Sequence, residues 1–346
     1  MKNNRNFLFT LFKLLSLSTV LIFFYFVYKK INYFDNDNIK KYFGLKKLNN
    51  YSNSINILFK NFKRKDVNFK ENIKIIKYNE KSENVCKSDL TLVIAYYDIN
   101  RVGRPKEEYF EWLNKTLKLN APIVFFTQSK LKDKILSLFP SYKQFWIVLI
   151  EIENLPYYNE LELVKSIQKN ETYKKKIYAP SRVECVNDLY SIIIFSKSFF
   201  LCTASKLNPF NSSKFVWIDA GLSRFFGQFD ISKELIGNRL SMSKLTILLD
   251  SNLKNHNSFV NRDYYDFLWS AKNFVKAGII AGSADVVCRF NDELYQEWRN
   301  MLDNGVVNNE QIGIILLYFR NPNLFNPWFF ETYKNDMDNF LDFLSN

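Results

Sequence analysis

Short apolar runs alternate with helix-like segments along the first half of the domain, and this alternation limits the possible folds more than any other feature. Residues 91–96, 123–127 and 145–152 are rich in β-branched and aromatic side chains, which predicts buried strands. Residues 107–118 and 131–139 lie between them and have helical spacing. Because strands that alternate with helices form parallel sheets joined by right-handed crossovers, we expect an α/β fold with a mostly parallel sheet flanked by helices.

The second half of the chain continues this pattern less regularly. Residues 186–204 predict one long helix, and residues 275–281 predict a further strand. Helices are expected at 292–303 and 309–318. We expect residues 90–346 to form a single domain.

The N-terminus contains an apolar segment long enough to cross a bilayer. Residues 7–28 are almost uninterrupted in their apolar character, and no small-residue cleavage pattern follows them. We therefore expect 1–6 to be a short cytoplasmic tail and 7–28 a transmembrane signal anchor that contacts the lipid bilayer. The polar, lysine-rich residues 29–89 are typical of a stem. This topology predicts a type II membrane protein with its domain in the lumen of the Golgi or the endoplasmic reticulum.

Composition excludes several classes of protein. The net charge of +13 comes from scattered lysines, which argues against nucleic acid and favours solubility, anionic lipid or an anionic small molecule. The single histidine, His256, excludes a histidine-rich zinc site. The sequence has no Rossmann or P-loop glycine motif. A bound phosphate therefore has to be neutralised by a metal, by lysine or arginine, or by a helix N-terminus.

Cysteines and glycosylation sequons bear on the compartment. The four cysteines are Cys86, Cys185, Cys202 and Cys288. They form no Cys-x-x-Cys pair, and their spacing fits disulfides in an oxidising lumen as well as buried free thiols. Asn-x-Ser/Thr sequons begin at Asn50, Asn114, Asn170 and Asn211. They are usable in a luminal domain.

A carboxylate follows a predicted strand at residues 215–218. Asp219 ends this apolar run, and Gly221 and Arg224 come directly after it. Open α/β sheets bind ligands at the carboxyl ends of their strands, so this position predicts a site. Asp219 can coordinate a divalent cation on a diphosphate, Gly221 allows close backbone approach, and Arg224 can neutralise a leaving phosphate. A capped strand with a surface ion pair is the structural alternative.

Two further candidates carry charges. Asp98 and Arg101 follow the first predicted strand and can hold a ribose hydroxyl and a phosphate, although a charged surface turn is the simpler interpretation. Lys197 shares one helix face with Tyr190 and Ile194, so it can point toward a phosphate. Alternatively, its ammonium extends to solvent while its stem packs.

The last candidates lie near the C-terminus. Gly278 and Gly282 flank a predicted strand and can lie against a substrate, although tight packing explains them nearly as well. Glu310 and Gln311 open an apolar helix. Glu310 is either a helix cap or, if the helix start faces a cleft, a general base.

In their order along the chain, these segments resemble the HtrL/YibB family of glycosyltransferase-like proteins, within the broad GT-A group of nucleotide-diphospho-sugar transferases. The likeness spans about residues 90–328. It rests on 91–99 with Arg101, Lys197-Ser198, 217–221 with Arg224, Glu310-Gln311 and 321–325.

The resemblance implies a GT-A-like domain that moves a sugar from a nucleotide-sugar donor to a glycan or protein hydroxyl. It assigns catalysis to Glu310 and Asp219, and acceptor binding to Gly278, Gly282 and Gln311. The implied donor-binding residues are Asp98, Arg101, Lys197, Asp219, Gly221 and Arg224. The second aspartate of the usual Asp-x-Asp pair is replaced by Gly221, so a requirement for Mn²⁺ or Mg²⁺ at Asp219 stays open. A catalytically inactive carbohydrate-binding or scaffold protein on the same fold is the alternative.

Overall fold

The computed structural model describes residues 73–78, 89–101, 103–254, 267–270, 274–331 and 333–346. The expected cytoplasmic tail, the expected anchor at 7–28, most of the expected stem, His256 and Cys86 lie outside these residues. Within the described part of the chain, none of the helices has both the length and the apolar character that crossing a bilayer requires.

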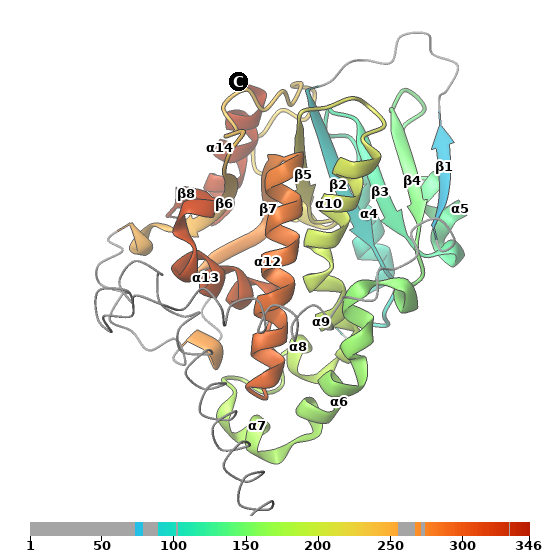
Figure 1. Ribbon diagram of the computed structural model, residues 1–346. Helices are drawn as coiled ribbons and strands as arrows, with labels where there is room; N and C mark the ends of the chain where they lie inside the picture. The colour runs from blue at the N-terminus through green and yellow to red at the C-terminus, as the bar shows by residue number, and fades with distance from the viewer. Residues whose placement is uncertain (1–72, 79–88, 102, 255–266, 271–273, 332) are drawn as a thin grey trace, which may run out of the picture. The chain divides into compact units, whose positions relative to one another are not determined.

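The described residues form one eight-stranded sheet in the order β1-β4-β3-β2-β5-β7-β6-β8 (Figure 1). The strands are β1 (Lys74–Tyr78), β2 (Leu90–Tyr96), β3 (Ile123–Thr127), β4 (Phe145–Leu149), β5 (Lys214–Ile218), β6 (Leu245–Asp250), β7 (Val275–Ser283) and β8 (Phe325–Phe330). Neighbours β4, β3, β2 and β5 are parallel. The alternation of strands and helices correctly predicted this half of the sheet.

The sheet as a whole is mixed, which corrects the expectation of a mostly parallel sheet. β7 runs antiparallel to both β5 and β6, and β1 runs antiparallel to β4, whereas β6 and β8 are parallel. The connection from β5 to β6 contains only one short 3-10 turn, η4 (Leu222–Phe225), so the rule for helical crossovers does not apply there.

The sheet also begins earlier than expected. β1 lies inside the range assigned to the stem and pairs with the edge strand β4. Ile75 and Ile76 lie opposite Val148 and Ile147, and apolar cross-strand pairs of this kind stabilise an added edge strand.

Helices cover both faces of the sheet. α4 (Lys106–Thr116), α5 (Lys132–Leu136) and α14 (Tyr333–Ser345) pack on one face with Leu92 and Ile94 of β2. Val93 of the same strand points to the opposite face because successive strand residues alternate. The helices on that face are α6 (Leu161–Lys169), α7 (Glu171–Lys176), α9 (Asp188–Phe195), α10 (Lys197–Leu207), α12 (Ala284–Asp303) and α13 (Glu310–Arg320).

The helix expected at 186–204 is two helices, α9 and α10. Its first residue, Val186, is the last residue of a separate short helix, α8 (Val183–Val186). Asn187 follows α8, and its side chain accepts a hydrogen bond from the Tyr190 amide and caps α9. A turn at Ser196 separates α9 from α10. The Asn187 cap and the turn at Ser196 therefore divide a segment whose apolar pattern is continuous.

The described cysteines include both a disulfide and a free thiol. Cys202 of α10 and Cys288 of α12 form a disulfide, which links two helices on the same face of the sheet. Cys185 is a buried free thiol. Both outcomes that the cysteine spacing allowed therefore occur in the described residues.

Candidate functional site

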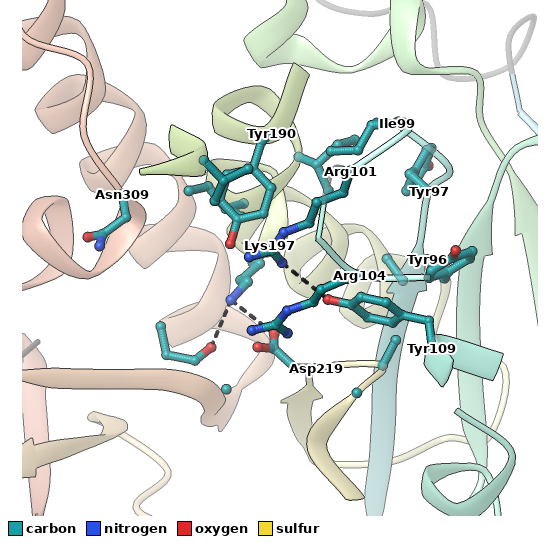
Figure 2. Close-up of a pocket in the computed structure, with 18 of the residues that line it drawn as sticks. Tyr96, Tyr97, Ile99, Arg101, Arg104, Tyr109, Tyr190, Lys197, Asp219 and Asn309 are labelled. Carbon is teal, nitrogen blue, oxygen red and sulfur yellow. Dashed lines mark hydrogen bonds and ion pairs between the residues drawn. The ribbon is translucent and has the colours of Figure 1, made fainter. Parts of the chain in front are cut away.

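A pocket of about 710 Å³ lies at the carboxyl ends of β2 and β5. These strands are neighbours and parallel, so the loops that follow them leave the same edge of the sheet. The antiparallel strand β7 brings its first residues to this edge, and α8, α9, α10 and the start of α13 close the opposite side. Figure 2 shows the side chains of Tyr190, Lys197 and Asp219 around the middle of the pocket.

Asp219 directly follows β5, and it lines the pocket. Its amide donates to the Gly278 carbonyl oxygen at 2.9 Å, which continues the pairing of β5 with β7. The indole Nε1 of Trp217 donates to Asp219 Oδ1 at 2.8 Å. Within the described residues no hydrogen bond or ion pair involves Oδ2, and the side chain is 32% exposed. Oδ2 is therefore available to a ligand.

Lys197 connects three elements at the base of the pocket. Its Nζ lies 2.9 Å from Asp219 Oδ1 and 2.6 Å from Glu310 Oε1, and it donates to the Ala277 carbonyl oxygen at 3.1 Å. The side chain is 9% exposed, so the ammonium does not extend to solvent. Burial acts to lower the pKa of Lys197, but the two carboxylates outweigh it and raise that pKa well above its ordinary value. Lys197 thus stays charged and holds both carboxylates.

Glu310 begins α13 and faces the pocket with a side chain that is only 5% exposed. It is not the helix cap, because the side chain of Asn309 accepts the hydrogen bond from the Ile312 amide. Burial raises the pKa of Glu310 above its ordinary value, and the charge of Lys197 only partly opposes this. A carboxyl group with raised proton affinity beside a pocket is suited to general base catalysis.

The pocket has an excess of positive charge. Seven cationic and four anionic side chains line it, which leaves a formal excess of three positive charges. Lys106 pairs with Asp98 at 2.5 Å and Arg182 pairs with Glu184 at 3.0 Å, while Lys197 holds the other two carboxylates. In the described part of the chain, no ion pair with a carboxylate involves the pocket arginines Arg101, Arg104 and Arg224. These three guanidinium groups face the pocket without a counter-charge from the protein.

Asp98 and Arg101 both line the pocket, but they do not pair with each other. Asp98 contacts Lys106, and its Oδ1 accepts a hydrogen bond from the Asn100 amide at 3.2 Å. Arg101 lies over the ring of Tyr190, 4.6 Å from its centroid, and donates to the Tyr109 hydroxyl at 3.3 Å. Asp98 therefore organises the loop, whereas the Arg101 guanidinium extends across the pocket.

The predicted glycines have different surroundings. A Cβ at Gly221 would lie 2.6 Å from Arg224 Nη1, so the glycine makes room for that guanidinium. Gly278 lines the pocket. Gly282 does not line the pocket. It lies four residues further along β7, about 13 Å from Gly278, where a Cβ would meet Leu245. Tight packing, the alternative reading of this segment, accounts for Gly282.

Gln311, the other predicted acceptor-binding residue, lines the pocket. Its Oε1 is buried and has no hydrogen-bond partner within the described residues. A buried, unpaired acceptor is unfavourable, and Gln311 is therefore a pocket residue whose Oε1 the described residues leave unsatisfied.

The described residues do not supply a ligand set for a resident divalent cation. Among them, no three His, Cys, Asp or Glu side chains lie close enough together to bind a metal ion. Asp219 Oδ1 already accepts hydrogen bonds from the Lys197 ammonium and the Trp217 indole. Mn²⁺ or Mg²⁺ at Asp219 would have one protein oxygen and a like charge close to it.

Several pocket residues are absent from the sequence-based assignment. They include Arg104, Lys106, Tyr109, Arg182, Glu184 and Lys276. A signal for the first two exists in the run 101–106, which places three cations around a proline, two before it and one after it, next to the start of a predicted helix. Arg182 and Lys276 come from segments without any recognisable motif, so only the fold brings them to the pocket.

Comparisons with known proteins identify one family. Residues 88–340 match the model of a family described as a bacterial protein of unknown function, HtrL_YibB. Protein HtrL of Escherichia coli (strain K12) is 22% identical over 261 residues, which cover 69% of this chain and 87% of HtrL. Among solved structures, the crystal structure of core-mannan synthase A from Aspergillus fumigatus, in its Mn/GDP form, matches with a TM-score of 0.39 and 14% identity. That match covers 70% of this chain and 73% of the synthase.

Proposed function

The chain belongs to the HtrL_YibB family, and from this premise we propose that it is a glycosyltransferase that uses a nucleotide-diphosphate sugar as its donor. The pocket carries the proposal. It combines a positive excess, suited to a diphosphate, with a buried carboxyl group of raised pKa, suited to accepting a proton. The acceptor is a hydroxyl group of a glycan or a protein.

In the proposed reaction, the bond between the anomeric carbon of the sugar and the diphosphate oxygen breaks. A bond forms between that carbon and the acceptor oxygen. Glu310 takes the proton of the acceptor hydroxyl if configuration is inverted, and the nucleoside diphosphate leaves with the bonding electron pair. Lys197 positions Glu310 and Asp219, and Asp219 Oδ2 accepts a hydrogen bond from a donor hydroxyl.

A panel of nucleotide sugars tests this function. Thermal stabilisation is measured with and without Mn²⁺, followed by donor hydrolysis. We expect at least one donor to bind and to be hydrolysed, and Asp219→Asn to weaken both effects. Asp303→Asn, an exposed carboxylate outside the pocket, is the control.

If no donor binds, or if Asp219→Asn changes neither binding nor turnover, the proposal fails. Stabilisation by free glycans alone would instead identify a carbohydrate-binding or scaffold protein on the same fold.

For the compartment, we propose a type II protein anchored by residues 7–28 with a luminal domain in the Golgi or the endoplasmic reticulum. The disulfide between Cys202 and Cys288 supports an oxidising compartment. Asn114 and Asn170 are exposed sequon positions. Glycosidase-sensitive mass at either asparagine in a glycosylating host supports this topology, and an unmodified chain argues against it.

A further inference from the structure

We infer that three arginines on an aromatic base, Arg101, Arg104 and Arg224, bind the diphosphate of the donor, and that this binding needs no divalent cation. We call these residues the arginine cluster. The inference rests on the proposed nucleotide-sugar function and deepens it, because it assigns the ligands of the diphosphate and adds Arg104 to them.

The aromatic base comes from one face of α4. The rings of Tyr109 and Trp112 lie 5.3 Å apart, at positions i and i+3 of the helix. Arg104 Cζ is 5.9 Å from the centroid of the Trp112 ring, and Arg224 Cζ is 5.3 Å from the same centroid. Two loops that are far apart in sequence thus place guanidinium groups on one indole.

Arg101 completes the cluster from the other side of Tyr109. Its Nη1 donates to the Tyr109 hydroxyl, and its guanidinium lies over the ring of Tyr190 in α9. Figure 2 shows the side chains of Arg101 and Arg104 directed toward the centre of the pocket, where Lys197 and Asp219 also lie. The cluster therefore borders the candidate catalytic carboxylates.

Apart from the bond from Arg101 Nη1 to Tyr109, no hydrogen bond within the described residues uses the donor groups of the three arginines. A guanidinium held over an aromatic ring keeps its edge N–H groups for an anion, and arginine binds phosphate oxygens in a bidentate manner. All three arginines are partly buried, and no ion pair within the described residues satisfies them. By contrast, Lys106 and Arg182 in the same pocket are paired with carboxylates.

Lys197 supplies the positive charge next to Asp219. Its ammonium lies 2.9 Å from Asp219 Oδ1. A metal ion bound to Asp219 would therefore share this carboxylate with the ammonium. A divalent cation at Asp219 would meet this ammonium at short range in a partly buried site, where like charges repel strongly. Fixed side-chain cations would thus supply the positive charge that a metal would otherwise bring to the diphosphate.

Nucleoside diphosphates are the probes for this inference. Binding of UDP, GDP, ADP and CDP to the full chain is measured by calorimetry in EDTA and again with Mn²⁺. We expect at least one of them to bind in EDTA with a dissociation constant within about threefold of its value in Mn²⁺. Binding that requires Mn²⁺ would overturn the inference and leave the glycosyltransferase function standing. If none binds under either condition, both proposals fail.

Arg104→Gln tests the cluster itself. We expect it to weaken diphosphate binding in EDTA at least tenfold, because one bidentate phosphate ligand is lost. Arg104→Lys keeps the charge but not the planar fork, and we expect an intermediate loss. Arg239→Gln, at an exposed arginine outside the pocket, is the matched control and should leave the affinity unchanged. Equal affinity of Arg104→Gln and the unsubstituted chain would show that the cluster is not the diphosphate site.

Discussion

Replacing Lys197 by methionine tests the buried charge cluster at the base of the pocket. The substitution keeps most of the side-chain volume and removes the ammonium that contacts Asp219 and Glu310. Removing one partner of a buried ion pair costs about 3–5 kcal/mol. Because Asp219 is 32% exposed and water partly solvates it, we expect the lower end, about 3 kcal/mol, at mildly alkaline pH.

The loss should depend on pH in a defined direction. Burial already raises the folded-state pKa of Glu310 above its ordinary value, and removing Lys197 raises it further. A carboxyl whose pKa is raised on folding stabilises the folded state below its unfolded pKa, and this contribution is lost as pH rises through the folded pKa. The variant can therefore neutralise Glu310 near pH 5, where we expect a loss of only about 1–2 kcal/mol.

Urea denaturation followed by tryptophan fluorescence, at about pH 5 and about pH 8, measures both values. Lys106→Met is the matched control, since its lysine is 49% exposed and pairs with Asp98 at the rim of the pocket. We expect it to change the free energy of unfolding by less than about 1 kcal/mol. Adding Glu310→Gln to Lys197→Met should restore part of the stability and remove most of the pH dependence.

A loss below about 1 kcal/mol for Lys197→Met at pH 8, or an equal loss at both pH values, would refute this reasoning. Either result would mean that the two carboxylates are solvated well enough to remain unpaired.

Three further changes have defined outcomes. Glu310→Gln should lower donor turnover by about 10²–10⁴-fold without changing nucleotide affinity. Turnover by the unsubstituted chain should rise with pH through a midpoint above 4.5. If Glu310→Gln leaves turnover unchanged, Glu310 is not the general base. Replacing Cys202 and Cys288 together by serine should lower the free energy of unfolding by about 4–5 kcal/mol, because the bond closes a loop of 86 residues; urea melts that differ by less than 1 kcal/mol would contradict this. Gly221→Ala places a Cβ 2.6 Å from Arg224 Nη1, so the guanidinium has to move and calorimetry should show severalfold weaker nucleoside diphosphate binding. An unchanged affinity would contradict the need for this position of Arg224.

The sequence predicted the parallel half of the sheet because that half is built from local units. The strand β3 was predicted at 123–127, where the structure has it, and each helix between β2, β3 and β4 is encoded beside the strands it connects. The strands β6 and β8 were not predicted. They pair with each other although 80 residues separate them in sequence. Pairing at this distance leaves no local pattern by which either strand could be told from an apolar loop.

Individual site residues could be predicted where their place on a predicted strand or helix was enough to bring them to the pocket. Asp219 follows a strand whose carboxyl end forms the pocket edge. The spacing of Lys197 with Tyr190 and Ile194 predicted a shared helical face, and all three line the pocket although a turn at Ser196 separates α9 from α10. The partners of Lys197 could not be predicted, because Glu310 lies 113 residues away and reaches it only through the packing of α13. Arg104 was missed for a different reason: it lies close to Trp112 in sequence, but Trp112 looks like an ordinary helix residue there.

The contacts of Lys197 would keep this residue in place in a related protein that had lost its activity. The same ammonium that borders the pocket also joins α10, the end of β5 and the start of α13, so its loss would destabilise the fold even in a copy without any catalytic role. The arginine cluster contributes little to folding, because cation–π contacts at partly exposed positions are worth about 0.5–1 kcal/mol each. In a related chain that keeps the fold, an intact Lys197 therefore says only that the chain folds. Under the proposed function, we expect the state of Arg104 and Arg224 to distinguish an active transferase from an inactive relative.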